Sequence, residues 1–93
     1  MADSIMQKKK ECYITKSTQD LHKHHIYYGN PNRRKSEQYG CWVWLRSDFH
    51  NMSDHGVHFD REFDLRLKRE CQKIFEQNHS REEFMMIFGR NYL

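Results

Sequence analysis

The sequence is poor in cysteine and has no long apolar run. Its three cysteines, Cys12, Cys41 and Cys71, include no CxxC pair, which is unlike the disulfide framework of a secreted protein. No stretch approaches the roughly 20 apolar residues of a membrane-spanning helix, and no signal peptide opens the chain. We therefore expect a reduced protein in the cytoplasm, without a membrane partner.

Motifs of several enzyme classes are also missing. The sequence has no glycine-rich phosphate-binding loop, and no serine or cysteine nucleophile with the flanking residues typical of such enzymes. The net charge is only +3, from 16 Lys and Arg against 13 Asp and Glu, and this alone does not indicate a nucleic-acid partner. The basic residues are nevertheless clustered at positions 8–10 and 33–35. For the first cluster, a solvated surface and a functional contact both remain open.

The chain is long enough for one small domain. Its apolar bulk comes largely from two Trp, five Tyr and six Phe residues, which offset the small number of aliphatic side chains. Residues 1–10 are polar and lysine-rich without periodicity, so we expect them to be a flexible basic leader. Residues 11–93 would then form the folded domain.

The pattern of the folded domain predicts strands first and helices later. Residues 21–28 and 41–45 are rich in strand-forming residues, and residues 30–37 read as a basic loop that joins them into a hairpin. An apolar stripe at helical spacing predicts a long helix after Asp60, which is a good N-cap. Ser80 opens a capping box and predicts a short last helix. The fold class that we expect is α+β.

Histidines gather in the middle of the chain, with six of the seven between residues 21 and 58. Histidine is the usual transition-metal ligand and the usual general base near neutral pH. His24 and His25 are neighbours on the first predicted strand, so their side chains face opposite ways. This geometry suits a division in which His24 faces a metal ion and His25 faces a water molecule. The residues that could complete such a site are His50, Asn51, Asp54 and His58.

The other histidines and the tryptophans have simpler interpretations. We expect His22 to be a supporting or surface residue, His55 to be solvated in a polar turn, and His79 to be structural. Trp42 and Trp44 share one face of their strand, and we expect them to be core residues rather than a base-stacking platform.

An ordered set of residues extends from the first predicted strand to the last residue. The set is His24-His25-Ile26, the basic loop through Arg33 to Ser36-Glu37, Tyr39-Gly40, Val43-Trp44-Leu45, His50-Asn51, Gly56-Val57-His58 and Phe88-Gly89-Arg90-Asn91-Tyr92-Leu93. It resembles small phage-encoded HNH-like proteins that are related to the recombination enhancement nuclease family. The resemblance covers nearly everything from Cys12 onward.

The resemblance implies a small ββα-metal domain, also called an HNH or His-Me finger, in which a hairpin core is followed by a long and a short helix. It implies a DNA endonuclease or nickase that acts in phage recombination or DNA processing, in the cytoplasm of a bacterial host. The expected cofactor is one divalent ion: Mg, Mn, Ni or Zn. The expected partners are DNA and a recombinase filament or another host protein. The implied roles are general base for His25 and metal ligands for His24, His50 and His58. From their positions in the sequence we also expect Asn51 to support the site, and Arg33, Arg34 and Lys35, in the loop beside it, to contact DNA.

Two alternatives remain beside the nuclease. A catalytically silent protein of the same fold could bind DNA or a host protein, for example to inhibit a host defence nuclease. A structural zinc module would explain the histidines but not the basic loop. A four-cysteine zinc site is not expected, because Thr15 stands three residues after Cys12, and Arg46 and Phe49 stand where a second pair would lie.

Overall fold

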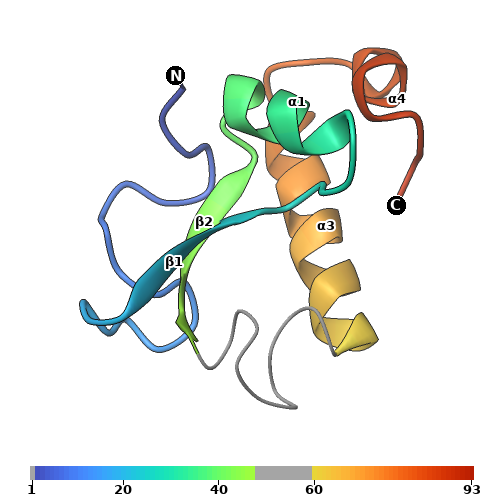
Figure 1. The fold of residues 1–93 in the computed structure, drawn as a ribbon. Coiled ribbons are helices and arrows are strands. Elements are labelled where there is room, and N and C mark those ends of the chain that lie inside the picture. Colours follow the sequence, from blue (N-terminus) through green and yellow to red (C-terminus); the bar gives the residue numbers. More distant parts are fainter. Residues whose placement is uncertain (1, 48–59) are drawn as a thin grey trace.

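The structure of the chain is a computed structural model, and it describes residues 2–47 and 60–93. Its elements are, in chain order, β1 (Leu21–His25), α1 (Asn32–Tyr39), β2 (Trp42–Arg46), α3 (Arg61–Phe75) and α4 (Arg81–Phe88). The strands β1 and β2 pair into a two-stranded antiparallel sheet, and the helices lie to one side of it (Figure 1). The expected mixture of helices and strands in one small domain is confirmed.

The register of the sheet divides the strand residues between two faces. His24 lies opposite Val43, while His25 lies opposite Trp42 and Lys23 opposite Trp44. Directly opposed residues of antiparallel strands point to the same face. Val43 is fully buried, so His24 belongs to the inner face, which meets the core, and Lys23 and His25 belong to the outer face.

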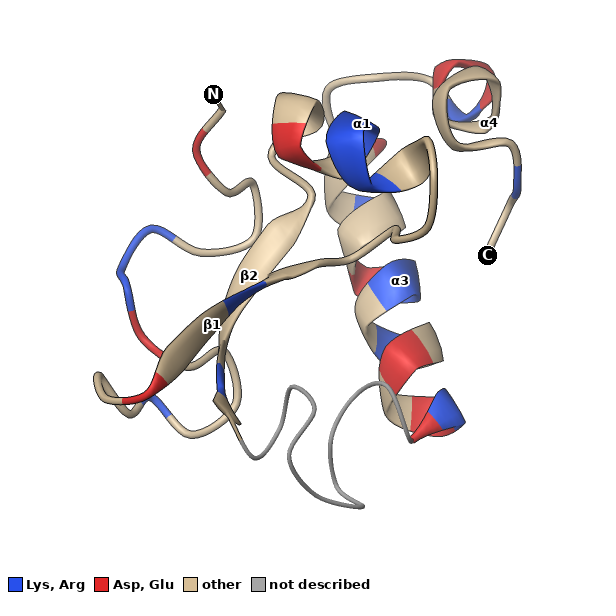
Figure 2. Ribbon diagram, viewed as in Figure 1, with Lys and Arg blue, Asp and Glu red and all other residues tan. Residues whose placement is uncertain are grey.

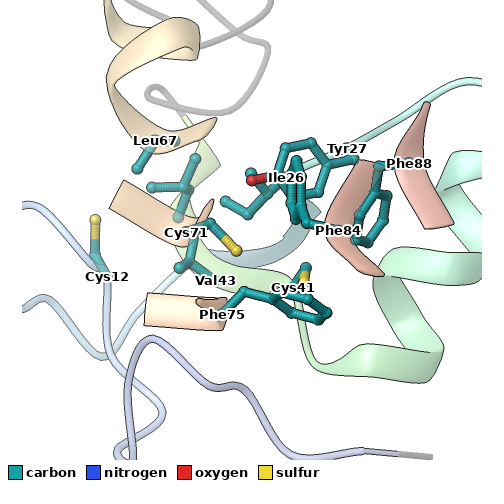
Figure 3. Packing of buried hydrophobic residues seen from close by; sticks show 11 residues of the cluster. Cys12, Ile26, Tyr27, Cys41, Val43, Leu67, Cys71, Phe75, Phe84 and Phe88 are labelled. Carbon is teal, nitrogen blue, oxygen red and sulfur yellow. The ribbon is translucent and has the colours of Figure 1, made fainter. Parts of the chain in front are cut away.

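The core joins the inner face of the sheet to the helices. Leu67, Cys71 and Phe75 come from one stripe of α3, as their helical spacing predicts, and Phe84 and Phe88 come from α4 (Figure 3). The Tyr27 ring packs against Phe84 and Phe88, with ring centroids 5.2 and 4.4 Å apart. The buried members of this cluster are Cys12, Ile26, Tyr27, Cys41, Val43, Leu45, Leu67, Cys71, Phe75, Phe84 and Phe88.

The prediction of a loop over residues 30–37 is wrong, because most of this segment is helix α1. The helix has almost no apolar face, and Ser36 is its one buried residue. Ser36 Oγ donates to the carbonyl of Tyr27 at 2.7 Å and accepts from the Tyr27 N–H at 3.1 Å. These two bonds replace the strand pairing that residue 27 would otherwise need, so β1 ends at His25 rather than at residue 28.

Gly40 ends α1 with φ of +75°, a conformation in which an L side chain is strained. A Cβ at this position would also collide with the backbone carbonyl of Asp3. The N-terminal segment therefore passes close to the junction between α1 and β2, and the Ile5 N–H donates to the Gly40 carbonyl at 2.9 Å.

Residues 2–10, expected to be a flexible leader, run beside β2 (Figure 1). Ser4 Oγ donates to the Trp42 carbonyl, and the Trp44 N–H donates to Gln7 Oε1 at 2.6 Å. Farther along, the Tyr13 N–H donates to the Trp44 carbonyl. This part of the chain covers the edge of β2 that β1 does not pair with, which removes an exposed strand edge.

Both predicted helices of the C-terminal half are confirmed with their caps. Asp60 Oδ1 accepts from the Phe63 N–H at the start of α3, and the capping box of Ser80 and Glu83 opens α4. The first helix ends at Phe75, slightly before the expected position near Asn78. Within the described residues, no helix combines the length and the apolar character that a membrane crossing requires.

Candidate functional site

An open pocket of about 550 Å³ lies where β1 ends and α1 begins. Its lining brings together residues that sequence reasoning had assigned to different roles. His25 comes from the last position of β1, and Arg33, Arg34 and Glu37 come from α1. Positions 33, 34 and 37 share one face of a helix, because residues three and four apart are neighbours on its surface. The other lining residues are Gly29 and Asn30.

The imidazole of His25 is paired with a carboxylate. Its Nε2 lies 3.0 Å from Glu37 Oε1, and 12% of the His25 side chain is exposed. The hydrogen bond from His25 holds the pKa of Glu37 below its ordinary value, and a further bond from Lys23 acts in the same direction. Glu37 is therefore ionised near neutral pH and can only accept, so that Nε2 carries the proton. In the neutral ring, Nδ1 is then the basic atom.

Lys23 is the second hydrogen-bond partner of Glu37. Its Nζ lies 3.3 Å from Oε1 and 3.4 Å from Oε2. Lys23 and His25 stand two residues apart on the outer face of β1, which is why both reach the same carboxylate. The contact with Lys23 holds the Glu37 carboxylate in place, and the carboxylate in turn orients the His25 imidazole.

The pocket also has the features of an anion site. Arg33 and Arg34 both line it, and Figure 2 shows the basic positions of α1 beside β1. The first turn of α1 contains no acidic residue, and its N-cap, Pro31, provides no capping hydrogen bond. The positive end of the helix dipole is therefore not offset by a local carboxylate, and this favours a phosphate near Gly29 and Asn30.

Lys35, expected to contact DNA together with the two arginines, is placed elsewhere. Its Nζ donates to the Ile87 carbonyl at 2.6 Å, and Asn32 Nδ2 donates to the neighbouring Phe88 carbonyl at 3.3 Å. Both carbonyls belong to the last turn of α4, where a cation is favoured by the helix dipole. Lys35 therefore ties α1 to α4 and does not line the pocket.

His24 lies on the opposite face of β1 from His25, as the alternation of strand side chains predicts. It is 1% exposed, and its ring centroid is 6.1 Å from that of Tyr28. Lys68 Nζ lies 4.3 Å from the centre of the same Tyr28 ring and 2.8 Å from Asp64 Oδ2. The second carboxylate oxygen of Asp64 is buried, and no hydrogen bond to it is found within residues 2–47 and 60–93. A partly buried polar cluster thus links His24 of β1, through Tyr28, to α3.

The described residues alone do not complete a metal site. Residues 2–47 and 60–93 contain no group of three His, Cys, Asp or Glu side chains placed to hold an ion. His24 and Asp64 supply potential ligand atoms, but Lys68 already neutralises Asp64. The described residues do not include the other predicted ligands, His50 and His58, or the supporting residue Asn51. Asp54 and His55 also lie outside them.

Glu37 and Lys23 are the site residues that sequence reasoning missed. The signal was present in the spacing of Arg33, Arg34 and Glu37, which is helical. It became visible only once residues 32–39 were known to be a helix. His79 was expected to be structural, and its ring stacks on Phe75 with centroids 4.3 Å apart.

Comparisons of the chain with models of known protein families, with curated proteins and with solved structures found no match. The inference about function therefore depends on the residues and on the geometry of the pocket.

Proposed function

We propose that the protein is an HNH-type, divalent-metal-dependent DNA endonuclease or nickase in which His25 is the general base. One observation carries this proposal: the carboxylate-paired His25 opens into a pocket that two arginines line. A base, an orienting carboxylate and an anion site within one pocket are what hydrolysis of a phosphodiester requires. The resemblance to the recombination enhancement nuclease family supports the same reaction. It also suggests a recombinase filament as partner and a bacterial cytoplasm as location.

The chain's own residues would divide the work as follows. The Nδ1 atom of His25 takes the proton of the attacking water, because Nε2 is already bonded to Glu37. The Glu37 carboxylate then stabilises the imidazolium that forms. Arg33 and Arg34 hold the phosphate oxygens with forked hydrogen bonds. A divalent cation, when bound, would stabilise the charge that develops on the phosphate, with His24, His50 and His58 as the proposed ligands. Of these, His24 lies on the inner face of β1, whereas the pocket opens on the outer face.

The decisive experiment is a supercoiled-plasmid nicking assay with Mg²⁺, Mn²⁺, Ni²⁺ or EDTA. We expect cation-dependent nicking that falls about 10²–10⁴-fold in His25→Ala, without loss of the fold. His79→Ala is the matched control, because this histidine stacks on Phe75, does not line the pocket, and bonds only Glu83 among the described side chains. Plasmid that stays intact in all cations while DNA is still bound would instead indicate the catalytically silent protein.

A binding experiment tests the anion site separately. Arg33→Ala with Arg34→Ala should weaken duplex binding and reduce the slope of log K against log salt by about 1.8, which corresponds to about 0.9 per phosphate contact. Lys35→Ala should leave this slope unchanged but lower the melting temperature, since Lys35 bonds the Ile87 carbonyl. If the double arginine variant keeps the parental salt slope, then Arg33 and Arg34 do not contact phosphates, and this part of the proposal is wrong.

A further inference from the structure

A second hollow, of about 530 Å³, lies beside the outer face of the sheet. The N-terminal segment and β2 form it together, and its most prominent side chains are basic and aromatic. We call this feature the lysine–tryptophan surface, and define it by residues 8–10, Lys23, Trp42 and Trp44. Lys23 also pairs with Glu37, but the other residues of this surface have no part in the proposed nuclease chemistry, and none of the six lines the pocket of His25.

The two tryptophans were expected to be core residues, and only one of them fits this expectation. Trp42 is 8% exposed, whereas Trp44 is half-buried and lines the hollow. The two rings meet edge to face, with centroids 5.5 Å apart and planes at 83°. Trp42 therefore supports the ring of Trp44, whose free side faces the N-terminal lysines.

Lysine head groups cover the aromatic faces. Lys10 Nζ lies 4.7 Å from the centre of the Trp44 ring, and Lys23 Nζ lies 4.2 Å from that of Trp42. Such cation–π contacts at exposed positions are weak, so an anion can draw the ammonium group off the ring. The ring that is uncovered in this way would be a flat apolar surface surrounded by cations.

The charge of the surface favours a polyanion. Residues 8–10 are all exposed lysines, and Asp3 is the one acidic residue among the described residues that line the hollow. The surface also adjoins the pocket of His25, because Lys23 contacts both Trp42 and Glu37. Lys23 and His25 are on the same face of β1. The outer face of the sheet therefore connects the pocket of His25 to the lysines at positions 8–10.

From this geometry we infer that the lysine–tryptophan surface binds single-stranded DNA, with one base stacked on Trp44 and the flanking phosphates on Lys8, Lys9 and Lys10. Basic grooves with aromatic platforms are how proteins bind single strands without sequence preference. A duplex would offer only its phosphates, because its bases are already stacked on each other. The inference rests on the proposed DNA substrate, but it does not depend on cleavage.

Tryptophan fluorescence reports on this surface directly, because Trp42 and Trp44 are the two tryptophans of the chain. We expect an oligothymidylate of about 12 nucleotides, a length within known site sizes, to quench the emission at saturation. Inorganic polyphosphate should compete for the lysines and yet give little quenching, since it has no base to stack. An oligothymidylate that binds without quenching would overturn the stacking on Trp44.

Matched variants separate charge from stacking. The triple variant Lys8→Ala, Lys9→Ala, Lys10→Ala should reduce the salt slope for the single strand by about 2, which is about 0.7 per phosphate contact. The control triple variant replaces Arg61, Arg69 and Lys73, exposed residues of α3, and should keep the parental slope. Trp44→Leu should weaken binding about 5- to 150-fold, and Trp44→Phe should recover part of the loss. Circular dichroism checks that each variant is folded.

The outcomes also keep this inference apart from the nuclease proposal. His25→Ala should bind and quench like the parent, so lost nicking with retained quenching leaves the surface intact. Equal salt slopes for the two triple variants would overturn the inference. So would tighter binding of the matched oligouridylate, which would assign the surface to RNA, or equal quenching by polyglutamate, which would assign it to an acidic protein.

Discussion

The Glu37→Gln variant is the most direct test of how the pocket works. The substitution keeps the shape of the side chain and removes its charge. The glutamine oxygen can still accept from His25 Nε2, so the ring can keep its orientation. The substitution removes the electrostatic stabilisation of the imidazolium that His25 becomes when it takes a proton.

The size of the effect follows from distance and exposure. Two opposite charges about 4 Å apart interact by about 1 kcal/mol in water and about 4 kcal/mol near a protein surface. The Glu37 side chain is 32% exposed and is shared with Lys23, so we place its effect on the imidazolium at about 1–2 kcal/mol. This corresponds to a decrease in kcat of about 5- to 30-fold.

The assay is the initial rate of plasmid nicking, measured from about pH 5 to pH 9. Glu37→Gln should lower the initial rate throughout this range, because the imidazolium that forms during the reaction is no longer stabilised. Glu82→Gln, an exposed position in the first turn of α4, is the control. If Glu37→Gln keeps the parental kcat, then Glu37 is a surface ion-pair partner only, and the proposed stabilisation of the imidazolium is refuted.

Three further predictions concern stability. Ser36→Ala should lower the free energy of unfolding by about 1–3 kcal/mol in urea titrations, because both backbone groups of Tyr27 lose their buried partner. Lys68→Met should cost about 3 kcal/mol by leaving the Asp64 carboxylate, which is 11% exposed, without its cation; adding Asp64→Asn should restore part of the loss. The depressed pKa of Glu37 stabilises the fold fully above its ordinary value of 4.5, and this contribution is lost as the pH falls through the lower folded-state value. The difference in melting temperature between the parent and Glu37→Gln should therefore shrink below pH 4.5, and a constant difference would contradict this linkage.

The helices of the C-terminal half could be predicted from the sequence because their signals are local. Asp60 and the pair Ser80 and Glu83 act within one helical turn, and the apolar stripe of α3 repeats at helical spacing. Helix α1 has neither a side-chain N-cap nor an apolar stripe. Its stability comes from contacts with residues far along the chain, such as that of Lys35 with the Ile87 carbonyl, and no window of residues 30–37 contains that information.

The same difference explains which site residues were found. His25 and the two arginines are conspicuous by residue type, and their meeting in one pocket could be anticipated from a turn between the strands. Glu37 is one of many glutamates, and its pairing with His25 depends on a helix that places it 12 positions later on the same side of the strand. Lys35, by contrast, was grouped with the arginines because of its charge. Its hydrogen bond to the Ile87 carbonyl instead makes it a link between α1 and α4.

Helix α1 thus supplies side chains that line the pocket and also the contacts that hold these side chains in place. Arg33, Arg34 and Glu37 face the pocket, while Ser36 and Lys35 hold the helix to β1 and to α4. A catalytic group must be held to within a fraction of an ångström, and sites on rigid elements achieve this better than sites on loops. A ββ unit joined by a loop would have left the carboxylate free to move. Ser36→Ala should therefore lower kcat as well as stability, although Ser36 is fully buried and does not line the pocket. A variant that is destabilised but has an unchanged kcat would show that Glu37 reaches His25 without the support of Ser36.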